Sequence, residues 1–408
     1  MDSINTGDTA WVLISTALVL MMTPALAFFY GGMVRKKNVL STLNLSFIMM
    51  ALISLQWVLF GFTLAFGADM GGFVGGLGYL GLAGVGSAPN PDYAATIPFL
   101  LFAAYQMMFA VITPALITGA FVERIRFKTF LVFSLLWATL VYDPVAHWVW
   151  GVGGILRTMG ALDFAGGTVV HITAGFSALA LAMVIRARQG FNSGASVEPH
   201  NIPFSVLGAG LLWMGWFGFN GGSALGANGL AVTALVNTNT AAAAAALVWM
   251  LLSWRDSRPS VLGIITGAVV GLVAITPAAG YVTPLGAMAI GALAAPISFY
   301  AIKLRQSRRL DESLDVWACH GMGGVWGALA TGLFATKAVN PAGSDGLFYG
   351  NPGQLAVQAL AVAVTIVFAF GVTWLLGNVL KRTIGLSVSD TEEQIGLDIA
   401  EHGERAYA

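Results

Sequence analysis

Long runs of apolar residues recur along the chain, separated by short polar or glycine-rich stretches. A helix needs about 20 predominantly apolar residues to cross a bilayer. Eleven runs reach or approach that length. They lie at about 10–33, 39–66, 97–121, 129–150, 166–186, 203–221, 229–253, 261–276, 284–304, 316–335 and 354–381. The pattern predicts an all-α integral membrane protein with eleven transmembrane helices.

Basic residues follow every second predicted helix. The clusters are Arg35, Lys36 and Lys37; Arg124, Arg126 and Lys128; Arg186 and Arg188; Arg255 and Arg258; Lys303, Arg305, Arg308 and Arg309; and Lys381 and Arg382. They hold 16 of the 19 Lys and Arg residues. Because loops rich in Lys and Arg stay in the cytoplasm, the N-terminus should lie outside and the C-terminus inside, with the protein in the cell (inner) membrane.

The composition agrees with a membrane protein and excludes other classes. Hydrophobic residues make up 57% of the chain, charged residues 9%, and the mean hydropathy is +0.79. A soluble domain carries about 25% charged residues. Nineteen basic residues balance nineteen acidic ones, which excludes a nucleic-acid binder, because that class needs a basic face. The single cysteine, Cys319, excludes an intrachain disulfide and leaves the redox compartment open.

The first apolar run resembles a signal peptide, because small residues at 24–27 follow it. A signal peptide begins with basic residues, however, and this segment begins with Asp2 and Asp8. The run also continues as far as Arg35. We therefore expect a first membrane helix.

An odd number of helices suggests two five-helix halves, at about 1–190 and 200–340, with the eleventh helix at 354–381. Five crossings change sides, so the halves must be inverted, as in many transporters. We expect a membrane domain over 1–385. The polar, acidic segment 386–408 should be a cytosolic regulatory tail, too short to form a domain.

Two histidines lie at membrane depth, where ionisable groups are costly and usually functional. His171 belongs to the fifth predicted helix, with Asp163 ahead of it, and His320 to the tenth, with Asp315 ahead of it. Each could be a satisfied core histidine. Together with Cys319 they could bind zinc, although no zinc-binding spacing is present. Their matching positions in the two halves favour a pair of imidazoles that share and pass on a proton.

Asp163 precedes two glycines and a threonine at the start of the fifth helix. Its carboxylate is placed to cap the helix by accepting from the backbone N–H groups of Gly166, Gly167 or Thr168. The functional alternative is that its charge holds a nearby carbonyl or attracts a cation.

A further set of residues could bind a cation, because aromatic faces attract cations and a hydroxyl can accept a hydrogen bond. The set is Phe109, Trp150, Trp216, Phe219 and Ser223. Individually, each could be a core residue or part of an interfacial aromatic belt.

Six segments resemble signatures of the Amt/Mep/Rh ammonium transporters, and of the Amt branch in particular. They are Asp163–Ile172, Ala27–Arg35, Gly119–Phe127, Trp213–Asn220, Thr276–Tyr281 and Asp315–Gly321. The resemblance covers essentially the whole chain. The tail, from Gly396 to Tyr407, resembles bacterial Amt tails that engage PII signal proteins.

The resemblance implies a homotrimeric ammonium channel with one pore per subunit, no cofactor, no bound metal and no enzymatic activity. It implies a substrate recruitment site of Phe109, Trp150 and Ser223; a gate of Phe109 and Phe219; a twin-His pair of His171 and His320; a pore-lining Trp216; and a structural and electrostatic carboxylate at Asp163. Ammonium would lose its proton and cross as ammonia, with methylammonium as an analogue. Potassium has no proton to give.

Two other functions remain open at this point. An Amt-like protein can be an ammonium sensor, which would here signal through a PII-type partner. An enzyme within the membrane has no supporting nucleophile–base constellation in the sequence. Whether transport moves net charge is also open.

Overall fold

The computed structural model describes residues 4–191, 193 and 198–407. Helix is present in each of the eleven segments that the apolar pattern marks. The main helices are α1 (Thr6–Met33), α2 (Val39–Gln56), α3 (Phe62–Phe66), α4 (Phe99–Ile117), α5 (Phe127–Trp137), α6 (Asp143–Trp150), α8 (Thr173–Val184), α9 (Ile202–Gly221), α10 (Gly229–Asp256), α11 (Val261–Ile275), α12 (Pro284–Ser307), α13 (Gly323–Phe334) and α14 (Pro352–Thr383).

Nine helices of the described residues are long and apolar enough to cross a membrane, two fewer than the sequence predicts. The two segments outside this set are α11, which has 15 residues, and the continuous helix that η8 (Trp317–Met322) and α13 form. Both are helical, so the difference concerns the length and hydropathy of these two helices.

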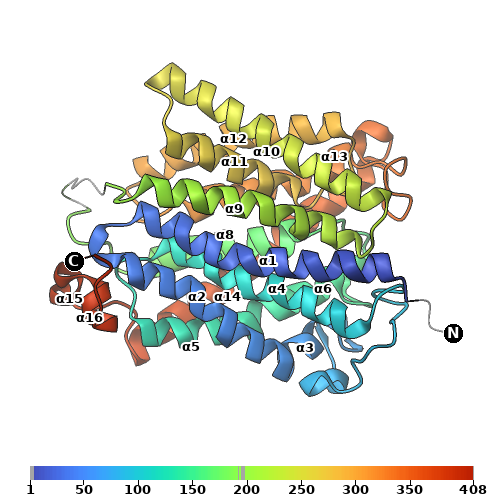
Figure 1. The fold of residues 1–408 in the computed structure, drawn as a ribbon, viewed down its shortest axis with the longest axis horizontal. Helices are drawn as coiled ribbons and strands as arrows, with labels where there is room; N and C mark the ends of the chain where they lie inside the picture. Colours follow the sequence, from blue (N-terminus) through green and yellow to red (C-terminus); the bar gives the residue numbers. More distant parts are fainter. Residues whose placement is uncertain (1–3, 192, 194–197, 408) are drawn as a thin grey trace.

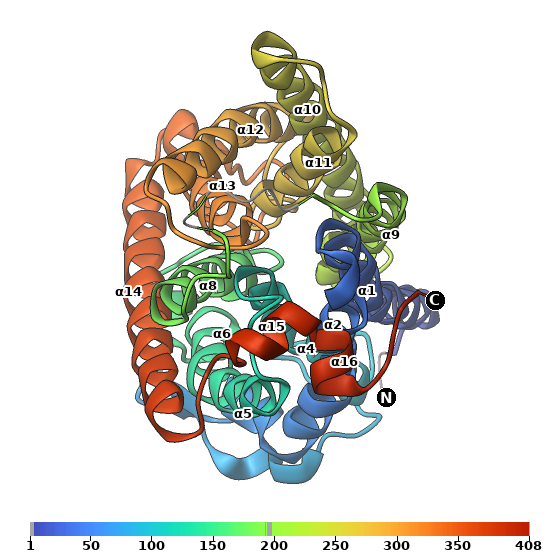
Figure 2. The same cartoon turned by 90° about the vertical axis from the view of Figure 1, so that its left-hand side faces the viewer.

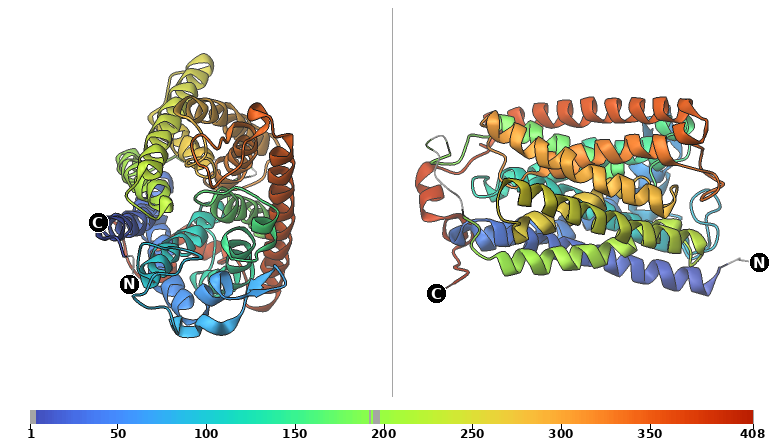
Figure 3. Two further views of the ribbon diagram at one scale, coloured as in Figure 1. Left: turned by 90° about the vertical axis from the view of Figure 1, so that its right-hand side faces the viewer. Right: turned by 90° about the horizontal axis from the view of Figure 1, so that it is seen from above.

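The helices run roughly parallel to the long axis of the molecule (Figure 1). The two termini lie at opposite ends of the bundle. We call these the N-end and the C-end. Seen from the C-end, the helices surround the middle of the molecule (Figure 2), and the long helix α14 runs along one side (Figure 3).

Small residues allow α1 and α9 to pack closely. A Cβ atom on Gly208 would lie 2.3 Å from the backbone nitrogen of Phe29, and one on Gly215 would lie 2.3 Å from Cγ of Met22. Because neither position has space for a side chain, these glycines serve helix packing, as is common between membrane helices.

Four π-helical segments interrupt the helices: η2 (Trp57–Gly61), η5 (Ala138–Tyr142), η6 (Gly167–Ile172) and η8 (Trp317–Met322). π-helical turns are rare and frequently occur at functional sites. η6 runs into α8, and η8 runs into α13. Each of the two candidate histidines therefore lies in a π-helical segment that runs into a helix.

The loops contain additional short elements. They are η1 (Lys36–Asn38), β1 (Asp69–Met70), β2 (Val74–Gly75), η3 (Leu77–Leu82), η4 (Thr118–Ala120), α7 (Ile155–Thr158), η7 (Gly222–Ala224) and η9 (Leu347–Tyr349). β1 and β2 pair as an antiparallel hairpin in the glycine-rich loop at the N-end.

The polar tail folds into two short helices, α15 (Asp390–Ile395) and α16 (Leu397–His402), which lie across the C-end of the bundle (Figure 2). Asp398 accepts from the backbone N–H of Ser41 at 2.8 Å. The side chain of Asn38 accepts from the N–H of Leu397 at 2.9 Å. The tail is thus fastened to the start of α2.

Candidate functional site

Three of the candidate residues meet at a cavity of about 540 Å³ at the N-end, which Phe109, Trp150 and Ser223 line. Trp150 packs edge-on against Phe109, with 5.9 Å between ring centroids. The indole N–H of Trp150 donates to the carbonyl of Asp163 at 3.0 Å, and this bond fixes the ring. The Ser223 hydroxyl lies 2.9 Å from the carbonyl of Phe219. The N-end cavity thus combines aromatic rings with a hydroxyl oxygen, which suits a small cation.

Phe109, which lines this cavity, forms an aromatic pair with Phe219. The centroids of Phe109 and Phe219 are 4.3 Å apart, and their planes are tilted by 40°. Both side chains are buried. The rings separate the N-end cavity, which Phe109 lines, from a narrower space that Phe219 lines. The pair thus lies where the two spaces approach each other.

That narrow space has a volume of about 10 Å³. Its lining is mostly apolar: Met22, Leu26, Phe29, Ile112, Leu116, Val170, His171, Leu212, Trp216, Phe219, Val269 and His320. By this measure it has room for about one water-sized molecule. An intact ion would find few polar groups here to replace its hydration shell.

The two histidines face each other in this lumen. Nδ1 of His171 lies 3.2 Å from Nδ1 of His320, so the two rings can share one proton. Nε2 of His171 is buried and has no hydrogen-bond partner among the described residues. His171 also stacks on Trp216, whose indole N–H donates to the Thr276 hydroxyl at 2.9 Å. Trp216 thus helps to hold the His171 ring, and the described residues leave its Nε2 unpaired.

A close approach of two helices brings the histidines together. A Cβ on Gly175 would lie 2.1 Å from the backbone nitrogen of Gly321. Gly175 follows His171 by one helical turn, and Gly321 is the residue after His320. The two glycines therefore permit the spacing of the imidazole pair.

Asp163 is buried against the start of η6. Its carboxylate accepts from four backbone N–H groups, those of Gly166, Gly167, Thr168 and Val169, at 2.7–3.2 Å. Burial raises the pKa of this carboxyl, and the N–H donors oppose that shift. The capping geometry is the one expected from the sequence, with one additional donor. It places the carboxylate beside the N-end cavity, which Asp163 also lines.

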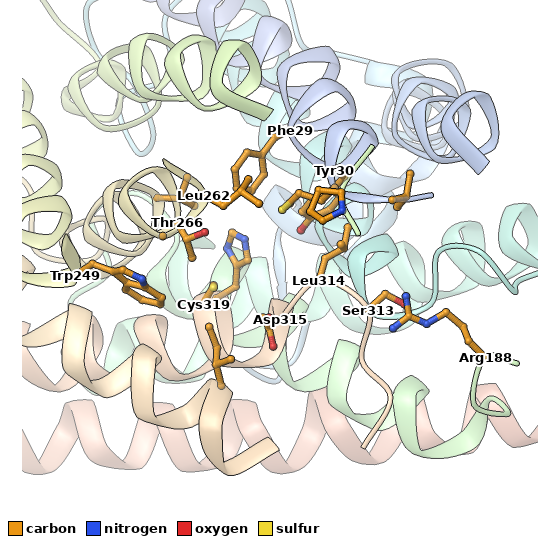
Figure 4. A pocket seen from close by; sticks show the side chains of 17 residues that line it. Phe29, Tyr30, Arg188, Trp249, Leu262, Thr266, Ser313, Leu314, Asp315 and Cys319 are labelled. Atoms are coloured by element: carbon orange, nitrogen blue, oxygen red, sulfur yellow. The ribbon is translucent and has the colours of Figure 1, made fainter. Parts of the chain in front are cut away.

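A second cavity of about 270 Å³ opens on the C-end side of the histidines, and His320 and Phe29 line both it and the narrow lumen. Figure 4 shows Thr266, Asp315 and Cys319 around it. The C-end cavity and the narrow lumen thus adjoin at His320 and Phe29.

The described residues include no group of three or more His, Cys, Asp or Glu side chains placed to hold a metal ion. Cys319 is buried beside His320, but only as its neighbour in sequence.

The sequence did not reveal an ion-pair network at the C-end. Buried Glu123 accepts from Nε of Arg35 at 2.9 Å and from Nη1 of Arg188 at 2.8 Å. Arg188 also pairs with Asp311 at 2.7 Å. Burial raises the pKa of Glu123, but its bonds to Arg35 and the charge of Arg188 outweigh burial and hold that pKa below its usual value. Glu393 of the tail joins this network through an ion pair, in which its Oε1 lies 3.7 Å from Nη2 of Arg35. The network thus connects the tail with four loops.

A helical membrane bundle with these cavities is typical of a channel or transporter for a small solute. The chain matches the Ammonium Transporter Family over residues 10–407. It is 50% identical over 401 residues to the ammonium transporter Amt1 of Archaeoglobus fulgidus, a match that covers 98% of this chain and 99% of that one. The chain belongs to the ammonium transporter family.

Solved structures share the fold. Mep2 of Candida albicans superposes with a TM-score of 0.91 at 36% identity, over 99% of this chain and 91% of that one. A structure titled "Sensor Amt Protein" superposes with a TM-score of 0.88 at 30% identity, over 97% of this chain and 98% of that one.

Proposed function

We propose that this protein is an ammonium transporter that binds ammonium in the N-end cavity, removes its proton and conducts ammonia to the cytoplasm. The observation that carries the proposal is the narrow lumen of about 10 Å³ between the phenylalanine pair and the paired imidazoles. Moving an intact ion into such a space costs tens of kcal/mol by Born solvation. Neutral ammonia avoids that cost, and His171 and His320 provide the acceptor for the proton. The chain is not an enzyme, because no bond of the substrate other than N–H is broken.

In this proposal, the recruitment site consists of Phe109, Trp150 and Ser223. The gate consists of Phe109 and Phe219, and the rings move apart to admit the solute. Asp163 supports the site through its hydrogen bonds and its charge.

The proposed topology has eleven spans, formed by two inverted five-helix halves over about 1–190 and 200–340 and a last helix over 354–381. The N-end lies outside and the C-end in the cytoplasm. The six basic clusters support this orientation, because cytoplasmic loops are enriched in Lys and Arg. The equivalent π-helical starts that carry His171 and His320 support the two halves. The membrane is the cell (inner) membrane.

The first prediction concerns recruitment. The double variant Ser223→Ala, Trp150→Leu should have an apparent affinity for ammonium about five- to thirtyfold weaker than the wild-type protein. The reason is that about 1–2 kcal/mol of hydrogen-bond and cation–π stabilisation is lost. The maximal rate should change less. Uptake measured against ammonium concentration tests this, and an unchanged apparent affinity would contradict the proposed site.

We also propose that the protein forms a homotrimer and that a cytosolic PII-type partner binds residues 386–408. Three copies of the tail would give avidity. Pull-down of the cognate PII protein by the purified full-length protein should succeed, and deletion of residues 386–408 should abolish it. Because the tail packs on the bundle, the deleted protein must elute as the full-length one does in size-exclusion chromatography. Equal capture by both proteins would disprove the role of the tail.

The sensor alternative keeps the same binding residues. The fold does not separate the two functions, because both the Mep2 structure and the structure titled "Sensor Amt Protein" superpose on this chain. Flux does separate them: purified protein in liposomes should carry ammonium, whereas a protein that only senses ammonium would bind it without flux.

A further inference from the structure

Tyr105 lies on α4, one helical turn before Phe109, and its side chain is fully buried. Its hydroxyl reaches the last turn of α9. The hydroxyl oxygen lies 2.8 Å from the carbonyl of Gly218, 2.9 Å from the carbonyl of Phe219 and 3.2 Å from Oγ of Ser223. Tyr105 thus contacts the Ser223 hydroxyl, which lines the N-end cavity, from the buried side of that residue.

The end of α9 provides the space for this hydroxyl. A Cβ on Gly222 would lie 2.7 Å from the Tyr105 hydroxyl oxygen and 2.6 Å from Cβ of Ser15. A side chain at position 222 would therefore displace the tyrosine. The absence of a side chain at Gly222 therefore permits the position of the Tyr105 hydroxyl.

The neighbouring groups limit where the two hydroxyl protons can point. Tyr105 and Ser223 carry one proton each, and the carbonyls of Gly218 and Phe219 are acceptors only. The Ser223 proton has two acceptors inside the protein, the Phe219 carbonyl at 2.9 Å and the Tyr105 oxygen at 3.2 Å. Donation to either acceptor uses the Ser223 proton within the protein. Its oxygen then offers a lone pair to the cavity.

We propose that Tyr105 is a positioning residue that fixes the Ser223 hydroxyl as a hydrogen-bond acceptor toward the N-end cavity. The cavity then favours small cations with N–H donors, that is, ammonium and primary alkylammonium ions. This inference rests on the proposed function, because it assigns the orientation of the proposed recruitment site. Tyr105 acts through Ser223 and does not touch the substrate.

A double-mutant cycle tests this role. Tyr105→Phe removes one oxygen atom and keeps the ring against Phe109, whose centroid is 5.0 Å away. It should raise the KM for ammonium about three- to tenfold, the value of one net hydrogen bond, and change the maximal rate less than twofold. Ser223→Ala should raise KM at least as much. The double variant should match Ser223→Ala alone, because both changes act on one hydroxyl.

Tyr142→Phe is the matched control, because Tyr142 is equally buried but its hydroxyl has no hydrogen-bond partner among the described residues. It should leave KM unchanged. A wild-type KM in Tyr105→Phe would overturn the proposal, and so would an effect that adds fully to that of Ser223→Ala.

Binding can be measured without transport, as the rise in melting temperature of each purified variant with ammonium concentration. In that titration, the double variant should again bind ammonium as Ser223→Ala does. Absence of ammonium flux through the wild-type protein would contradict the proposed function, whereas the binding cycle would still decide the role of Tyr105.

Discussion

Replacing either His171 or His320 with Asp should open the pore to potassium. A carboxylate at this position puts a fixed negative charge in a lumen that the wild-type protein keeps mostly apolar. At an effective dielectric constant of about 20, a charge 4 Å from a cation stabilises it by about 4 kcal/mol, and each 1.4 kcal/mol changes a rate tenfold. We therefore expect potassium flux in proteoliposomes to rise by about tenfold or more over the wild-type protein.

Asn is the matched replacement without a charge. It fills a similar volume and does not titrate, so His171→Asn and His320→Asn should abolish any proton-coupled current while ammonia can still permeate. Potassium should stay excluded in both Asn variants. Wild-type ammonium current and intact potassium exclusion in the Asp and Asn variants alike would show that the histidines only fill space in the core.

Loss of the Asp163 carboxylate should destabilise the protein more than any other single change considered. Asp163→Ala leaves four buried backbone N–H groups at the start of η6 without an acceptor. Each unsatisfied buried group costs about 1–3 kcal/mol, so even partial rehydration leaves a loss of about 3 kcal/mol or more. Ammonium flux should fall with it, because η6 carries His171.

Asp92 offers a control for this experiment, since it is an exposed carboxylate that lines the same cavity. The melting temperature of purified Asp163→Ala should drop by several degrees, while that of Asp92→Ala should stay at the wild-type value. A wild-type melting temperature in Asp163→Ala would refute the capping role, and equal losses in both variants would trace the effect to the charge of the cavity as a whole.

Much of the helical architecture could be predicted from the sequence, because the length of an apolar run is a local signal. The segment 354–381 corresponds closely to α14, and 229–253 to α10. The hydropathy of the chain did not distinguish the shorter α11 from a full span. The π-helical segments were not predicted, because a single extra residue per turn leaves no trace in composition. The tail helices depend on contacts such as that of Asp398 with Ser41, far away in the chain.

The site shows a similar division. Depth in the membrane singled out His171 and His320, and the glycines after Asp163 indicated a helix cap. Only the family resemblance led us to expect one shared cavity for Phe109, Trp150 and Ser223. These residues belong to three different helices, so no local pattern connects them. Glu123 was missed because its partners, Arg35 and Arg188, are 88 and 65 residues away in sequence. Tyr105 was missed because a tyrosine in an apolar helix has no local signal for its hydroxyl partner.

The central claim is that the pore selects ammonium by removing its proton, since size and charge do not distinguish ammonium from potassium. The most direct measurement places purified wild-type protein in liposomes and compares flux under equal gradients of ammonium and potassium. The account predicts saturable ammonium transport and no potassium flux above that of protein-free liposomes. Potassium flux comparable to that of ammonium would show that intact cations cross the lumen, and would contradict the account.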